Sequence, residues 1–68
     1  MNIREACDAV LGEDLSRSLI AGMGIQWAVV AATAECKVSH GPVVKATLKA
    51  WVAEQKRRTQ HRAERDDG

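Results

Sequence analysis

The chain has 68 residues, with ten lysines and arginines against nine aspartates and glutamates and a net charge of +1. A chain of this length allows one small domain, whose core is marginal unless a partner chain, a metal or a cross-link adds to it. It can hardly form an enzyme's cleft, and no serine, histidine and carboxylate arrangement or glycine-rich phosphate loop stands out. We therefore expect no catalysis.

The two cysteines, Cys7 and Cys36, indicate free thiols in a reducing cytoplasm rather than a disulfide-stapled secreted domain. Together with His40 and His61 they supply the number, but not the paired spacing, of a zinc site. We expect neither a metal nor a cofactor. The N-terminus lacks a basic stretch followed by an apolar segment, so no signal peptide is expected.

The sequence predicts an all-α fold of three to four short helices, of which the C-terminal one is extended and basic, because apolar residues recur at helical spacing and no alternating strand pattern occurs. Asn2 can cap a first helix that runs to about Leu11, and Gly12 ends it. Negative charge at Glu13 and Asp14 then favours the start of a second helix.

Residues 22–24, Gly-Met-Gly, predict a break in the chain, since glycine costs roughly 1 kcal/mol in a helix interior. The alternative is one long helix over residues 14–37, which would give a helical hairpin dimer with its bend at His40 and Gly41. Residues 18–34 carry no charge, but this run of 17 is mostly small side chains with Gln26 in its middle. A membrane span needs about 20 predominantly apolar residues, so we expect a buried helix and no membrane partner.

Residues 28–51 predict a helix-turn-helix: a small-residue helix, an abrupt break, and a second helix that begins between Ser39 and Pro42. Ser39 suits the N-cap, and Pro42 suits the first helical turn. Such a turn needs one buried aliphatic anchor, and Val38 is the only aliphatic residue in the break. From the second helix, the residues expected to face back are Val43 with Ala46 or Thr47.

The run Val38-Ser39-His40-Gly41-Pro42-Val43-Val44-Lys45-Ala46 resembles the turn and recognition helix of GntR-type bacterial regulators, whose pattern is V-S-x-x-P-V-x-x-A. The next residues are similar to the N-terminal DNA-binding domain of plasmid KfrA-type proteins, which ends in I-x-x-x-L-[KR]-x-W; here these positions are Val44, Leu48, Lys49 and Trp51. The resemblance implies a module that reads DNA sequence with the helix after Pro42 in the major groove.

Positive charge is concentrated toward the C-terminus, where residues 45–68 carry seven lysines and arginines against four acidic residues. We divide the chain into a helical domain over residues 1–55 and a basic, partly disordered tail over residues 56–68. The tail is either a solvated helix end or an arm that contacts phosphate. The residues expected to contact DNA are Ser39, His40, Gly41, Lys45, Lys49, Lys56, Arg57 and Arg58.

The sequence predicts a small DNA-binding transcriptional regulator that acts as a homodimer, because the core is small and a weak half-site must be doubled. The alternative is a small dimeric helical adapter or inhibitor, of the phage or plasmid type, that binds a host protein through an apolar face with a tryptophan. Both tryptophans are expected to pack as core residues, one of them across a dimer interface. The candidate interface residues are Leu19, Met23, Trp27 and Trp51.

Overall fold

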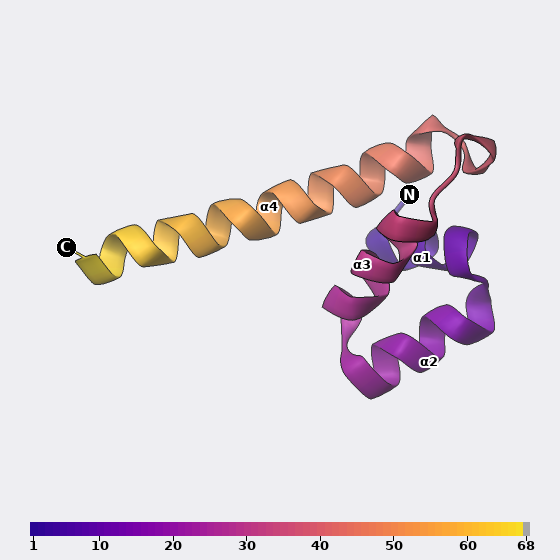
Figure 1. The fold of residues 1–68 in the computed structure, drawn as a ribbon, viewed down its shortest axis with the longest axis horizontal. Coiled ribbons are helices and arrows are strands. Elements are labelled where there is room, and N and C mark those ends of the chain that lie inside the picture. The colour runs from indigo at the N-terminus through magenta and orange to yellow at the C-terminus, as the bar shows by residue number, and fades with distance from the viewer. Residues whose placement is uncertain (68) are drawn as a thin grey trace.

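The computed structural model describes residues 1–67, and the side chains of residues 1–59. Its elements are α1 (Ile3–Leu11), α2 (Glu13–Met23), α3 (Ile25–Glu35), a short 3-10 helix η1 (Val38–His40) and α4 (Pro42–Asp67). No strand occurs within the described residues, so the predicted all-α class is confirmed. Helices α1 to α3 form a compact body, and α4 packs on α1 and α3 before it projects well beyond them (Figure 1).

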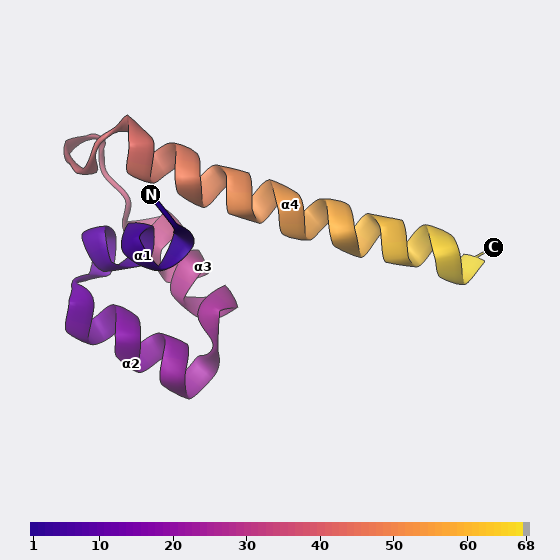
Figure 2. The same cartoon turned by 180° about the vertical axis from the view of Figure 1, so that it is seen from behind.

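The extension of α4 is equally plain from the opposite side (Figure 2). At about 1.5 Å per residue its 26 residues span roughly 39 Å. That length accounts for most of the longest dimension of the molecule, 44 Å. The predicted extended C-terminal helix is therefore present, and it continues through the segment assigned to the tail. The side chains beyond residue 59, including Arg62 and Arg65 of the expected phosphate-contacting arm, lie outside the described residues.

The first helix has the ends that its sequence predicts. The Oδ1 atom of Asn2 accepts from the N–H of Glu5 at 2.9 Å, and Oε1 of Glu5 accepts from the N–H of Asn2 at 3.0 Å. This reciprocal pair of hydrogen bonds satisfies backbone N–H donors that otherwise have no partner at a helix N-terminus. At the other end the N–H of Gly12 donates to the carbonyl of Asp8 at 2.9 Å, which confirms Gly12 as the stop.

The break between α2 and α3 falls at Gly24, which adopts φ +100° and ψ 159°. A residue with a side chain adopts this backbone conformation only at a high energetic cost, whereas glycine tolerates it. The predicted break at residues 22–24 is therefore confirmed. The alternative of one long helix over residues 14–37 is wrong because the backbone turns at Gly24. The helical hairpin dimer required that long helix, so it is wrong as well.

The core consists mainly of small side chains. Seven apolar residues are almost fully buried, and none of them is aromatic among the described side chains: Ala6, Cys7, Ala28, Val29, Ala32, Val44 and Leu48. Alanines allow the helices to approach closely but bury little apolar area each. The domain therefore has limited apolar burial from its own chain.

The connection from α3 to α4 differs from the prediction. It covers residues 36–41 and includes η1, whereas a helix-turn-helix turn has three or four residues. Val38, the expected buried anchor, is 95% exposed. Val43, expected to face back, is 60% exposed, and the body is contacted instead by Val44 and Leu48. Both predictions are wrong. The face of α4 that packs on the body carries Val44 and Leu48 rather than Val43, and Val38 lies in η1, outside the core cluster.

The start of α4 lies within the predicted window, at Pro42, directly after Gly41 with φ +96°. Ser39 is not its N-cap, because Ser39 lies inside η1. The residue at the cap position is Gly41, whose carbonyl accepts from the N–H of Lys45 at 3.4 Å. The sequence thus located the helix start correctly and assigned the cap to the wrong residue.

Candidate nucleic-acid interface

The rotation of α4 about its own axis is determined by the apolar residues that it buries. Val44 is 4% exposed and Leu48 is 1% exposed, and Trp51 is partly buried against the same cluster. Because these residues recur every three or four positions, they occupy one face of the helix. Lys45 and Lys49 lie outside that face and are exposed.

Three lysines of α4, Lys45, Lys49 and Lys56, form what we call the lysine stripe. At about 100° per residue they fall within roughly 40° of one another around the helix axis. All three are exposed. Among residues 1–59, no carboxylate lies within ion-pair distance of any of them. Their positive charge is therefore available to an anionic ligand.

The two arginines that follow the stripe share one carboxylate. Arg57 lies 3.6 Å and Arg58 lies 3.5 Å from the carboxylate oxygens of Glu54. These contacts are exposed and long, and such surface pairs contribute little stability. An approaching phosphate can therefore compete with Glu54 for either guanidinium group. Residues 42–59 contain five lysines and arginines, and Glu54 is the single acidic residue among them.

Three of the predicted DNA-contacting residues, Ser39, His40 and Gly41, lie together in the connection that precedes α4. Ser39 is exposed and His40 is partly buried. The Nδ1 atom of His40 accepts from the backbone N–H of Lys37 at 2.9 Å, so this nitrogen is occupied by the fold. A contact from the imidazole to DNA would have to use the other ring nitrogen.

The four residues predicted for a protein interface divide into two pairs. Leu19 and Trp51 are partly buried against the core cluster. Met23 and Trp27, by contrast, are 57% and 56% exposed. The prediction that Trp27 packs in the core is therefore wrong. The inward positions of α3 are taken by smaller residues, Ala28, Val29 and Ala32, which allow α3 to lie close to its neighbours.

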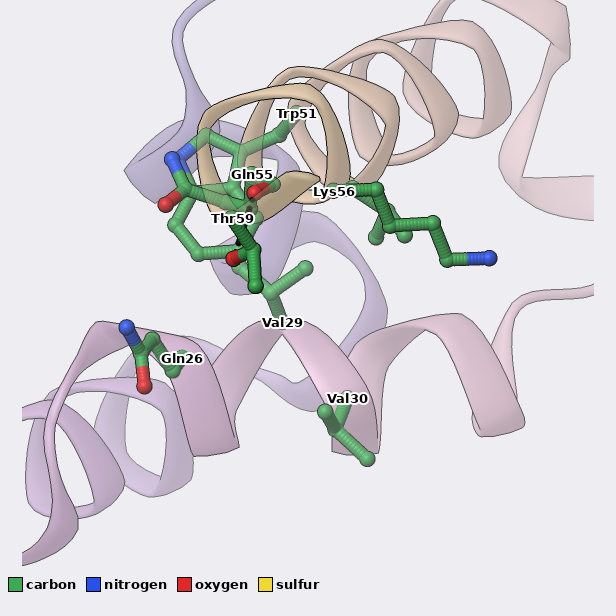
Figure 3. Close-up of a pocket in the computed structure, with 8 residues that line it drawn as sticks. Gln26, Val29, Val30, Trp51, Gln55, Lys56 and Thr59 are labelled. Atoms are coloured by element: carbon green, nitrogen blue, oxygen red, sulfur yellow. Dashed lines mark hydrogen bonds between the residues drawn. The ribbon is translucent and has the colours of Figure 1, made fainter. Parts of the chain in front are cut away.

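An open groove of about 440 Å³ separates α3 from the part of α4 that leaves the body (Figure 3). Val29 points from α3 toward α4, and Lys56 extends along the rim. The residues that line the groove include Gln26, Val29, Val30, Trp51, Val52 and Lys56. Sequence reasoning named only Trp51 and Lys56 of these, although the uncharged run over residues 18–34 was a signal that α3 presents an apolar surface.

Two other classes of site are not found in the part of the chain that the structure describes. No group of three or more histidine, cysteine or acidic side chains is placed to share a metal ion within these residues. No helix there combines the length and the apolar character needed to cross a bilayer. Both cysteines are free thiols, with Cys7 buried and Cys36 partly buried.

Comparisons with protein-family models, with curated proteins and with solved structures found no match to this chain. The resemblance of residues 38–51 to GntR-type and KfrA-type domains therefore stays a prediction. The arrangement of α4 and its cations is the basis for assigning a function.

Proposed function

We propose that this protein binds double-stranded DNA through α4, in an arrangement like a helix-turn-helix in which α3 supports α4 and α4 enters the major groove. The observation that carries the proposal is the lysine stripe on a helix that projects beyond the body. An α-helix fits a major groove, which is about 12 Å wide. Lysines that neutralise phosphates release condensed counterions, and this release drives binding.

The distribution of charge supports an approach with α4 toward the duplex. Residues 1–41 carry five acidic residues against three lysines and arginines, the opposite balance to α4. The electrostatic field of such a molecule orients its basic helix toward phosphate and its acidic body away from it. The charge on α4 therefore favours both affinity and orientation.

The proposal rests on the charge and exposure of α4 rather than on the turn. The six-residue connection and the exposed Val38 differ from a compact helix-turn-helix. Lysines that contact phosphate position a protein without reading sequence, whereas side chains at the start of a recognition helix reach base edges. In this chain the residues at the start of α4 or just before it are Ser39, His40 and Lys45. Regulation of transcription follows only if these residues discriminate between sequences.

The test compares two double variants with the same change of charge. Lys45→Glu with Lys49→Glu alters the stripe, and the control, Arg4→Glu with Arg17→Glu, alters exposed residues of the body. Fluorescence anisotropy on random and enriched duplexes at two salt concentrations gives the affinities. We expect the wild-type affinity to fall steeply with salt, and the stripe variant to bind on the order of 10- to 100-fold more weakly. Circular dichroism checks that all variants keep their helices.

Two results would contradict DNA binding through α4. The first is no salt-sensitive binding of the wild type at micromolar protein. The second is an equal loss of affinity in the body control, which would indicate that only total charge matters.

A second candidate function, an adapter or inhibitor of a host protein, is favoured by the exposed Trp27, which lies in the part of α3 that carries no charge, residues 25–34. Buried tryptophans dominate the binding energy of many protein interfaces. The stripe variant separates the two functions, because Lys45→Glu with Lys49→Glu should leave such a protein interaction almost unchanged unless the lysines line it.

A further inference from the structure

The groove between α3 and the projecting part of α4 has apolar walls and one charged group. Val29 points from α3 toward α4 at this groove (Figure 3). Val30, Trp51 and Val52 line it as well. Among the lining residues that the structure describes, none is acidic, and Lys56 alone is basic. The volume of about 440 Å³ lies within the range of small-molecule sites, about 300 to 1,000 Å³.

The positive charge of Lys56 is not neutralised by the nearest carboxylate of its own helix. Glu54 precedes it by two residues, so the two side chains lie roughly 160° apart around the helix axis. The carboxylate of Glu54 contacts Arg57 and Arg58 instead, at 3.6 and 3.5 Å. Across the groove, residues 25–34 of α3 contain no charged side chain. The charge that would complement Lys56 must therefore come from a ligand.

Two amide side chains give the groove neutral hydrogen-bonding groups. Gln26 lies on α3 and Gln55 on α4, and neither amide makes a hydrogen bond to another described residue. Figure 3 shows Gln26 and Lys56 at opposite ends of the lining side chains. An amide offers two N–H donors without adding negative charge. The polar groups of the groove can therefore all donate to an anionic ligand.

These properties favour one class of ligand. A ligand with an ammonium group is repelled by Lys56, and a strongly hydrated anion such as inorganic phosphate gains nothing from apolar walls. A carboxylate with an apolar chain uses both features of the groove. Its chain removes the exposed valine and tryptophan surface from water, and its oxygens accept a charge-assisted hydrogen bond from the ammonium group.

We infer that the groove binds a small amphipathic monocarboxylate, whose apolar chain lies along the valines and Trp51 and whose carboxylate contacts Lys56. Lys56 also belongs to the lysine stripe, so the bound carboxylate occupies one of the cations available to DNA. Each ligand should therefore lower the affinity for the other by the same factor. This competition rests on the proposed function, whereas binding of the carboxylate does not.

The test is a titration of the ¹⁵N-labelled full chain with octanoate at constant ionic strength, followed by NMR through the two indole N–H signals. Trp51 lines the groove, and Trp27, exposed and outside the groove, is an internal control. Trp27→Phe assigns the two signals. We expect the Trp51 signal to shift saturably at millimolar octanoate and the Trp27 signal to stay nearly unchanged.

Octanamide, which has the same chain without the charge, isolates the contribution of Lys56. Lys56→Gln should weaken octanoate binding by about three- to tenfold and leave octanamide binding as it is in the wild type. The matched control is Lys37→Gln, which removes an exposed lysine outside the groove and should not affect either probe. Both lysines are exposed, so neither change removes a core contact, and circular dichroism checks the fold.

A second pair of variants tests the apolar wall with two exposed valines. Val30→Asp places a carboxylate in the wall and should abolish octanoate binding, because it repels the ligand and removes apolar surface. Val43→Asp makes the same change on α4 outside the groove and should leave binding intact. The two valines are 57% and 60% exposed, so the changes are comparable.

No saturable shift of the Trp51 signal at millimolar octanoate would overturn the inference. Equal shifts of both indole signals would overturn it too, because they indicate general adsorption to apolar surface. Equal weakening by Lys56→Gln and Lys37→Gln would show that only total charge matters. The titration contains no DNA, so its failure is distinct from a failure of duplex binding. If the wild type bound duplex equally with and without saturating octanoate, competition at Lys56 would be wrong.

Discussion

The backbone N–H of Lys37 donates a hydrogen bond to Nδ1 of His40 at 2.9 Å, and the N–H of His40 donates to the carbonyl of Lys37 at 3.0 Å. This reciprocal pair closes η1 immediately before Gly41 and the start of α4. His40 was predicted to contact DNA, but the structure gives its ring a role in holding the turn from which α4 begins.

Replacement of His40 by alanine should lower the free energy of unfolding by about 0.5 to 1.5 kcal/mol, because the N–H of Lys37 loses its side-chain acceptor. His40→Asn keeps an acceptor on a short side chain and should recover part of the loss. Urea denaturation monitored by circular dichroism measures both. If asparagine and alanine were equally destabilising, the hydrogen bond would not be the cause.

Two glycines near the α2–α3 break should respond in opposite directions to alanine. Gly24→Ala places a side chain at φ +100° and ψ 159°, which should cost about 1 to 3 kcal/mol although no atom lies within 4 Å of the added Cβ. Gly22→Ala lies within α2, also with nothing within 4 Å, and should stabilise by up to about 1 kcal/mol. Thermal or urea unfolding gives the sign. Equal effects of the two changes would argue against a break located at Gly24.

Ser16 on α2 is fully buried, and its hydroxyl has no hydrogen-bond partner among the described residues. A buried hydroxyl without a partner is costly, so Ser16→Ala should stabilise the fold. The control is Ser18→Ala, an exposed change on the same helix that gains helix propensity alone. We expect Ser16→Ala to exceed this control by about 1 kcal/mol in urea unfolding. A destabilised Ser16→Ala protein would indicate that the hydroxyl does have a partner.

The two thiols should differ in reactivity. Burial, and to a lesser extent the charge of Asp8, raises the pKa of Cys7 above its ordinary value of 9.0. The thiolate is the reactive form, so Cys7 should react slowly with a thiol reagent in the native protein and Cys36 should react faster. Labelling followed by mass spectrometry of peptides measures the two rates. Equal rates at both cysteines would contradict the burial of Cys7.

The same pKa shift predicts how stability depends on pH. Above pH 9.0 the unfolded chain loses the Cys7 proton while the native protein keeps it, so the native state binds more protons. The contribution of this group to stability is therefore complete below pH 9.0 and is lost as the pH rises through the higher native pKa. Cys7→Ala should flatten the fall of unfolding free energy over this range.

Several ends of helices were predictable because they depend on neighbours in the sequence. Asn2 and Glu5 cap each other across three residues, and Gly12, Gly24 and Pro42 have backbone preferences of their own. These local signals determined the all-α class, the break between α2 and α3, and the start of α4. No long-range contact was needed for any of them.

The tertiary structure alone decided which faces of these helices are covered. Val38 and Val43 are as apolar as Val44, yet only Val44 is buried, because it shares a face of α4 with Leu48 and that face meets α1 and α3. Trp27 stays outside for the corresponding reason, since the smaller side chains of α3 fill the inward positions. Burial depends on the competition between faces for surfaces that lie far away in the sequence, and that competition is resolved only when the helices pack.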